Sequence, residues 1–143
     1  MPNDACAFRH RVEVRFRDCD PMGHVNHAVY FTYLEVCRFA FWRALTGRRI
    51  GPDSGIILAR AECDYRAPAV PGELLEVRLD VADIGRSSFT LVYTIVNADG
   101  RLVAEAKTVL VAYDYSAGRV VPLTDADRAL LERARAGAAE PSA

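Results

Sequence analysis

Residues 27–45 read HAVYFTYLEVCRFAFWRAL and contain neither proline nor glycine. This length predicts a helix of roughly five turns at 3.6 residues per turn, and Asn26 is a residue type that caps helix N-termini. The polar positions Thr32, Glu35 and Arg38 recur every third residue and form one narrow stripe, whereas most other positions are large and apolar. A helix with so little polar surface has to be surrounded by other structure.

The surrounding structure is predicted to consist of antiparallel strands. Val12, Val14 and Phe16 alternate with charged residues, which is the pattern of a strand that covers a core on one face. Short connections containing glycine or proline separate the later strands, and such connections permit antiparallel neighbours but not parallel crossovers. The predicted strands are residues 11–17, 57–66, 74–83, 88–97, 102–114 and 119–123. A short helix is predicted over residues 126–136, and Thr124 with Asp127 three residues later gives its start signal.

This order of elements indicates an α+β fold. With 143 residues and 51% hydrophobic residues, the chain suits one compact domain spanning residues 1–143. We expect its ends, residues 1–9 and 137–143, to be flexible. Strand 88–97 carries apolar residues on both faces, for instance Phe89 and Val92, so we expect it to be central in the sheet.

The composition excludes several classes of partner. A net charge of -1 and a pI near 6.3 give no broad basic field for binding nucleic acid. The N-terminus is polar and no apolar run approaches the ~20 residues that span a bilayer, so we expect a cytoplasmic protein with no membrane partner. Cys6, Cys19, Cys37 and Cys63 form no Cys-x-x-Cys pair and are predicted to be free thiols, with Cys37 and Cys63 packed in the core.

Most of the chemically able residues lie in the segment 18–26, which reads DCDPMGHVN and is predicted to be a loop. Asp20 precedes the start of the buried helix, where unpaired N–H groups could stabilise an oxyanion formed from a carbonyl. Its carboxylate could act as a nucleophile or as a general base that removes a proton from water. The alternative is that Asp20 only caps the turn.

The loop and the helix start resemble the hallmark segment of 4-hydroxybenzoyl-CoA thioesterase-type hotdog-fold acyl-CoA thioesterases. The resemblance rests on residues 18–31, on residues 33–35 with Arg38, and on the segments 65–73, 84–89 and 106–109. It implies an antiparallel β-sheet wrapped around a long central α-helix. It also implies a homodimer whose sheets join edge to edge, with the active site between subunits, and often a homotetramer.

The implied activity is hydrolysis of an acyl-CoA, or a related acyl thioester, to free acid and CoA without a cofactor or a metal. Asp20 takes the place of the catalytic acid, and the main-chain N–H at His27 that of the group polarising the carbonyl. His24 is expected to orient water or to hydrogen-bond Asp20. The resemblance departs at His27, where many long-chain enzymes have asparagine, and at Met22, where acyl-carrier-protein thioesterases have asparagine.

Other expected site residues carry an alternative interpretation. Gly23, Asn26, Tyr30 and Glu35 are predicted to bind substrate, although Glu35 could instead pair with Arg38 three residues on. A predicted turn contains Arg86, Ser87 and Ser88, whose hydrogen-bonding groups suit the phosphates of CoA. Lys107 and Arg66 could help to bind the same phosphates. The alternative is that this turn is simply exposed to solvent. His24 and His27 could in principle bind zinc or iron, but a third ligand is not evident.

The sequence is also compatible with two other functions. A hotdog hydratase or dehydratase needs a paired histidine and acid, but the chain does not have the His-Phe-Pro-type segment of such enzymes. A noncatalytic acyl-CoA-binding protein is the second alternative. As a transcriptional sensor it would need a DNA-reading element, and the sequence contains neither a helix-turn-helix pattern nor a basic arm.

Overall fold

The computed structural model describes residues 6–139. The elements in order are β1 (Phe8–Glu13), the 3-10 helix η1 (Phe16–Asp18), α1 (Val29–Thr46), β2 (Ile56–Tyr65), β3 (Leu74–Ile84), β4 (Ser88–Asn97), β5 (Leu102–Asp114), β6 (Arg119–Val120) and α2 (Asp125–Ala139). The predicted flexible ends, residues 1–9 and 137–143, lie partly outside the described residues. Inside them, Phe8 and Arg9 belong to β1, and residues 137–139 belong to α2.

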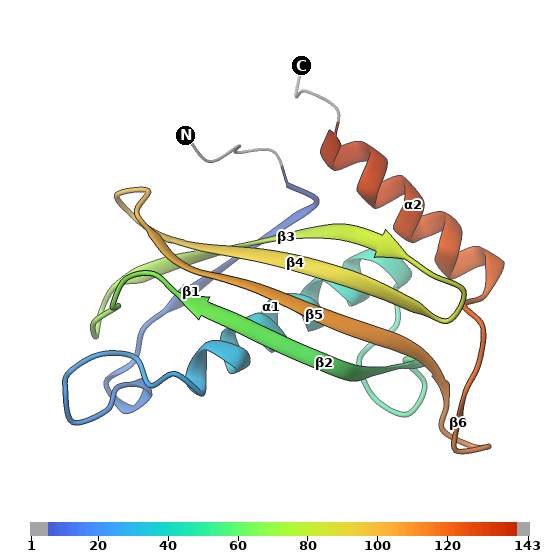
Figure 1. Ribbon diagram of the computed structural model, residues 1–143, viewed down its shortest axis with the longest axis horizontal. Helices are drawn as coiled ribbons and strands as arrows, with labels where there is room; N and C mark the ends of the chain where they lie inside the picture. The colour runs from blue at the N-terminus through green and yellow to red at the C-terminus, as the bar shows by residue number, and fades with distance from the viewer. Residues whose placement is uncertain (1–5, 140–143) are drawn as a thin grey trace.

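A six-stranded antiparallel sheet lies across the long helix α1, as Figure 1 shows. The strand order is β1-β3-β4-β5-β2, with the short β6 paired to β5. α2 packs against β3 (Figure 1). The predicted α+β hotdog architecture is therefore confirmed, and β4 is central as expected because β3 and β5 flank it.

The core lies between the inner face of the sheet and α1. Alternate residues of β4 are buried, among them Phe89, Leu91 and Ile95. The Trp42 indole of α1 stacks on the Phe89 ring, with ring centroids 5.5 Å apart. The sheet covers one side of α1 along its length, and this burial explains why so much of the helix surface is apolar.

The first strand differs from its prediction. β1 spans Phe8–Glu13 rather than 11–17, and the chain then turns into η1. Val14 is buried as expected, but the Phe16 side chain is 88% exposed. The turn forms because the Asp18 carboxylate accepts a hydrogen bond from the Arg15 N–H at 3.0 Å, which ends the alternation on which the prediction for Phe16 depends.

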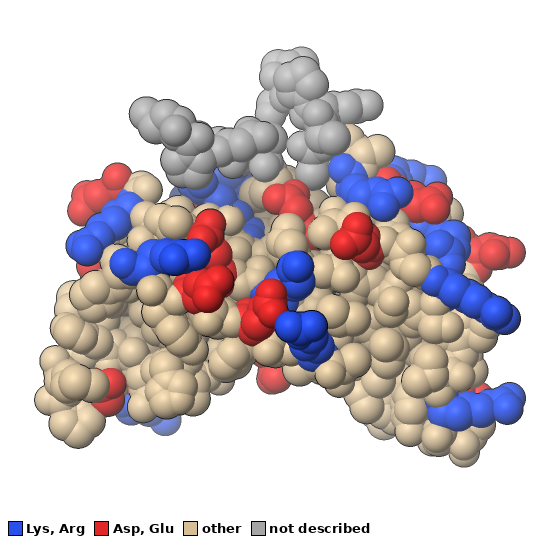
Figure 2. Space-filling model, in the orientation of Figure 1, with Lys and Arg blue, Asp and Glu red and all other residues tan. Residues whose placement is uncertain are grey.

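The two outer strands, β1 and β2, leave the sheet with open edges. β2 is exposed at nearly every position after Ile56. Its apolar side chains Ile57 and Leu58 are 37% and 44% exposed, and Val36 and Phe39 of α1 are 43% and 37% exposed. The surface is hollowed at the edge where β2 lies (Figure 2). A free edge strand beside exposed apolar residues is typical of a surface that pairs with another chain.

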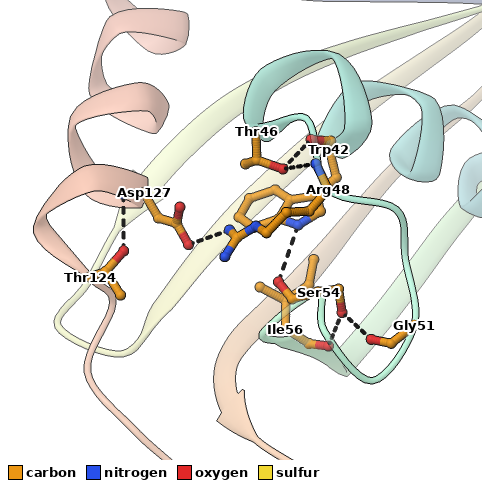
Figure 3. Close-up of polar contacts among 8 residues, drawn as sticks. All are labelled: Trp42, Thr46, Arg48, Gly51, Ser54, Ile56, Thr124 and Asp127. Carbon is orange, nitrogen blue, oxygen red and sulfur yellow. Dashed lines mark hydrogen bonds and ion pairs between the residues drawn. The ribbon is translucent and has the colours of Figure 1, made fainter.

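The C-terminal helix is fixed to the end of α1 by a polar cluster (Figure 3). Thr124 caps α2, as predicted, because its hydroxyl accepts the Asp127 N–H at 3.1 Å. The Asp127 carboxylate pairs with the Arg48 guanidinium at 2.6 Å, and this guanidinium lies 5.5 Å from the centre of the Trp42 ring. The Trp42 indole N–H in turn donates to the Ser54 carbonyl at 3.3 Å.

Basic and acidic side chains are interspersed on the face shown in Figure 2, so no single-sign field is visible there. Among the described residues, no helix is long and apolar enough to cross a membrane. Cys6, Cys19, Cys37 and Cys63 are free thiols. Cys37 is fully buried and Cys63 is half-buried against the core, in line with their predicted packing roles.

Candidate active site

The loop between η1 and α1 folds back on itself as a narrow antiparallel pair. The Asp20 N–H donates to the His24 carbonyl at 2.9 Å, and the Gly23 N–H donates to the Asp20 carbonyl at 2.9 Å. Gly23 has a φ of +82°, a conformation that residues with a Cβ rarely adopt. An added Cβ would meet no atom within 4 Å, so the turn, rather than a close protein neighbour, requires the glycine.

Three bonds anchor this loop to its surroundings. The Val25 N–H donates to the Ala69 carbonyl and the Asn26 N–H to the Asp18 carbonyl, both at 2.9 Å. The Tyr33 hydroxyl of α1 donates to the Asp18 carboxylate at 2.7 Å. The loop therefore has a defined position between α1 and the segment that follows β2.

Asp18 is an ionised side chain at a buried position, with only 3% exposure. Burial by itself raises the pKa of Asp18, but hydrogen bonds from the Arg15 side chain, the Arg15 N–H and the Tyr33 hydroxyl outweigh it and lower the pKa. Burial, together with the bond to Asp18, raises the pKa of Tyr33. Tyr33 consequently donates its proton to a carboxylate that stays charged at neutral pH.

The Asp20 carboxylate is half-buried and has one committed and one available oxygen. Oδ1 accepts the Met22 N–H at 2.9 Å, so Asp20 does cap the turn. No donor within residues 6–139 contacts Oδ2. Turn capping and catalysis are thus compatible, because the capping bond to Oδ1 holds the carboxyl group in place and leaves Oδ2 free.

The start of α1 leaves the His27 N–H without an acceptor among the described residues. α1 begins at Val29, two residues later than predicted. The Asn26 side-chain oxygen accepts the Ala28 N–H and the Asn26 carbonyl accepts the Val29 N–H, each at 2.9 Å. The N–H of His27 contacts no acceptor in the described part of the chain. The prediction of Asn26 as the N-cap is therefore wrong, because Ala28 is the N-cap residue and α1 has no side-chain cap bond; the Asn26 side chain instead holds the turn just before the helix. The free amide is at the position that the resemblance indicates.

Asp20, His24 and His27 meet at a cavity of about 380 Å³ beside the N-terminus of α1. Its lining residues are Asp20, Met22, His24, Val25, His27, Tyr30, Tyr65, Arg66, Ala67 and Pro68. The volume lies within the range of small-molecule sites. Burial raises the pKa of the Tyr30 hydroxyl to about 12, so this phenol stays protonated. The cavity combines a carboxylate, two imidazoles and phenol rings.

Several lining residues have no individual role in the sequence prediction. Tyr65, Ala67 and Pro68 belong to the second segment of the resemblance, which carries the only sequence signal for them. Arg66 lies at the cavity and its guanidinium pairs with Glu105 at 3.1 Å. Tyr65 is the last residue of β2 and the other three follow it, so only the folded sheet brings them to the loop.

Other expected site residues lie away from this cavity. Glu35 is 52% exposed and its carboxylate lies 4.0 Å from the Arg38 guanidinium, which is the local ion pair that their spacing of three residues predicts. Arg38 itself is buried and donates to the Tyr93 hydroxyl at 3.5 Å. Lys107 of β5 is exposed and pairs in register with Glu62 of β2.

The predicted CoA-binding turn, residues 86–88, lies at the opposite end of the sheet. Ser88 pairs with Val111, whereas Tyr65 pairs with Ala104. These two positions of β5 are seven residues apart, which corresponds to roughly 23 Å at 3.3 Å per residue. One copy of the chain therefore does not bring this turn to the cavity.

Within residues 6–139, no group of three or more His, Cys, Asp and Glu side chains has the geometry to hold a metal ion. His24 and His27 thus line the cavity without a third ligand.

Comparison with known proteins places this fold and site in a family. The profile of the Thioesterase-like superfamily matches residues 14–131, which is most of the chain. The protein belongs to this superfamily. The expected hotdog thioesterase resemblance and the predicted enzyme class, a thioester hydrolase, are thereby confirmed at the level of the family.

Individual relatives cover most of the chain. A thioesterase from Thermus thermophilus, solved in complex with coenzyme A and Zn, is 31% identical, with a TM-score of 0.84, and the match covers 94% of this chain and 98% of that one. A 1,4-dihydroxy-2-naphthoyl-CoA hydrolase of Thermosynechococcus vestitus is 32% identical over 78% of this chain and 80% of its own. The acyl-CoA thioester hydrolase YbgC of Escherichia coli is 29% identical, covering 75% and 82%.

Proposed function

We propose that the protein hydrolyses acyl-CoA thioesters, with Asp20 as the central carboxylate and the His27 N–H as the oxyanion donor. One observation carries the proposal. The available oxygen of Asp20 and the unpaired N–H of His27 belong to residues that line the same cavity, at the N-terminus of the buried helix. A carbonyl bound there can be polarised by the amide while the carboxylate acts on its carbon.

Two routes use these groups. In the first, Asp20 attacks the carbonyl carbon, the C–S bond breaks, the CoA thiolate takes a proton, and water hydrolyses the resulting mixed anhydride. In the second, Asp20 takes a proton from water, hydroxide adds to the carbon, and the proton passes to the leaving thiolate. Both give free acid and CoA, and neither uses a cofactor. His24, beside Asp20 in the cavity, would orient the water.

We also propose that a second copy completes the site. The free edge of β2 and its exposed apolar neighbours suit antiparallel pairing of two β2 strands. Such pairing places the Ile56 end of one copy beside the Tyr65 end of the other. The Arg86, Ser87 and Ser88 turn of one copy would then approach the cavity of its partner and meet the CoA phosphates there. Glu35 and Lys107 are proposed to act across the same interface, and two dimers would form the tetramer.

The relatives and the cavity walls indicate which acyl groups the site could accept. The relatives include one protein named for acyl-CoA and one named for an aromatic CoA thioester. The cavity walls include phenol rings, apolar side chains and the Arg66 guanidinium. We therefore keep both aliphatic and aromatic acyl-CoAs as candidate substrates of a cytoplasmic enzyme.

The test is to incubate purified protein with short, long and aromatic acyl-CoAs and to follow release of free thiol. We expect turnover of at least one class, and a loss of roughly 10²-fold or more in kcat for Asp20→Ala. Asp99→Ala is the matched control, because Asp99 lies exposed in the β4–β5 turn. A single turnover in ¹⁸O-labelled water can identify the first route, since label recovered in Asp20 would require a mixed anhydride that water opened at the Asp20 carbonyl.

Other outcomes would point to the alternatives. Tight CoA binding without turnover of any thioester would favour a noncatalytic binding protein. Hydration or dehydration of an enoyl- or hydroxyacyl-CoA would indicate the other hotdog reaction. Specific activity that stays constant below the concentration at which dimers dissociate would contradict the shared site.

A further inference from the structure

The Tyr65 side chain, for which the sequence suggests no role, connects the edge strand to the candidate oxyanion donor. Tyr65 is the last residue of β2. Its hydroxyl donates to the His27 carbonyl at 2.8 Å, across 38 positions of sequence. Tyr65 also lines the cavity that contains Asp20 and His27. The bond therefore joins two walls of the same site.

The His27 carbonyl depends on this bond because the helix does not use it in its first turn. The Phe31 N–H, which an ideal α-helix would direct to the His27 carbonyl, donates to Ala28 instead, at 3.2 Å. On the other side of His27, the Asn26 carbonyl is held by the Val29 N–H. The Ala28 N–H of the peptide unit that contains the His27 carbonyl donates to the Asn26 side-chain oxygen at 2.9 Å. Tyr65 supplies the bond on the carbonyl side of this unit.

The Tyr65 ring is itself held in place. It meets the Tyr30 ring edge-on, with centroids 5.2 Å apart and planes inclined by 61°. Tyr30 is only 3% exposed and lies in the first turn of α1. Tyr65 is 45% exposed, so its position depends on the ring contact and on the hydroxyl bond rather than on enclosure.

We propose that Tyr65 is a positioning residue, whose hydroxyl fixes the His27 backbone so that its N–H is preorganised for the thioester oxyanion. This inference rests on the proposed function of the site. A preorganised donor contributes in the transition state, where charge develops on the oxygen, and contributes little to binding the uncharged ground state. Loss of the Tyr65 hydroxyl should therefore lower kcat and leave KM nearly unchanged.

Tyr65 itself belongs to β2, one of the two free edge strands of the sheet. Because β2 is the strand proposed to pair with a second copy, displacement of this strand would be transmitted to His27 through a single hydrogen bond. The oxyanion donor is in this way tied to the proposed interface.

Tyr65→Phe tests the role, and Tyr115→Phe is its matched control. The Tyr115 hydroxyl also donates to a backbone carbonyl, that of Ile56 at 2.7 Å, at the opposite end of β2. Each variant removes one hydroxyl and one bond to a main-chain oxygen. Deleting an oxyanion donor costs about 10²–10³-fold in kcat, so releasing one should cost less. We expect kcat to fall roughly 10-fold or more for Tyr65→Phe, KM to change less than about threefold, and both constants to be unaffected in Tyr115→Phe.

The outcomes distinguish the role of Tyr65 from the proposed function of the site. Equal kcat values for wild type and Tyr65→Phe, with an active wild type, would overturn the role of Tyr65 alone. A thermal midpoint that falls much further for Tyr65→Phe than for Tyr115→Phe, with KM and kcat affected together, would show a structural role and overturn it as well. A wild-type protein that hydrolyses no thioester refutes the proposed function and this inference with it.

Discussion

Replacing Asp18 with asparagine tests whether one buried carboxylate holds the loop that carries Asp20. In the native protein, one oxygen of Asp18 accepts a hydrogen bond from Arg15 Nη2 at 3.0 Å. The other accepts the Arg15 N–H at 3.0 Å and the Tyr33 hydroxyl at 2.7 Å. Asparagine can keep the bonds to one oxygen, but its NH₂ group then faces the donors of the Arg15 guanidinium.

The expected cost follows from the exposure of the two partners. The Arg15 side chain is 55% exposed, so solvent screens the ion pair and the pair itself contributes little. Leaving a buried polar group badly paired costs about 1–3 kcal/mol more. We therefore expect Asp18→Asn to lower the free energy of unfolding by about 2 kcal/mol, equivalent to roughly 5–10 °C in Tm for a chain of this size.

Urea unfolding followed by the fluorescence of Trp42, the single tryptophan, measures this loss. The native state depresses the pKa of Asp18 below its ordinary value of 3.8. The stabilisation is therefore present above pH 3.8 and is lost as the pH falls through the native pKa. The difference between wild type and Asp18→Asn should be constant from pH 5 to 7 and should shrink below about pH 4. Asp99→Asn, a change of an exposed turn residue, serves as control. Equal stabilities at pH 7 would refute the anchoring role of Asp18.

Two further changes test the packing around α1. Arg48→Ala removes the pair with Asp127 and the cover of the Trp42 ring, so it should cost about 1–2 kcal/mol and shift the native emission of Trp42; an unchanged emission would argue against the contact. Burial raises the pKa of the Cys37 thiol to about 12, so Ellman's reagent at pH 8 should leave Cys37 unmodified until the protein unfolds. Cys37→Ala should then give the same native thiol count as wild type, and a lower count would show that Cys37 is reachable.

The regular elements of the fold were predictable from the sequence. β4 and β5 have the predicted bounds, and α1 and β2 differ from theirs by one or two residues. Periodicity predicts such elements because each side chain's direction depends on its position within its own strand or helix. The first strand is an exception, because a side-chain bond to the backbone ends it before Phe16. The last strand is another, since it spans only Arg119–Val120 of the predicted 119–123.

The loop and its carboxylate were also indicated by the sequence, because Asp20, Gly23 and Asn26 act within a few residues of themselves. Asp20 caps its own turn, Gly23 supplies the left-handed φ, and Asn26 accepts the Ala28 N–H. Turn and capping chemistry is local, so residue type and spacing are enough to predict it.

Contacts between distant segments were decided only by the tertiary structure. Sequence spacing could not show that the Tyr65 hydroxyl meets His27, that Tyr33 reaches Asp18, or that residues 86–88 lie at the far end of the sheet from the cavity. These placements depend on strand register, in which Tyr65 aligns with Ala104 and Ser88 with Val111. Register is set by the packing of the whole sheet on α1, a sum over many weak contacts that no short segment contains.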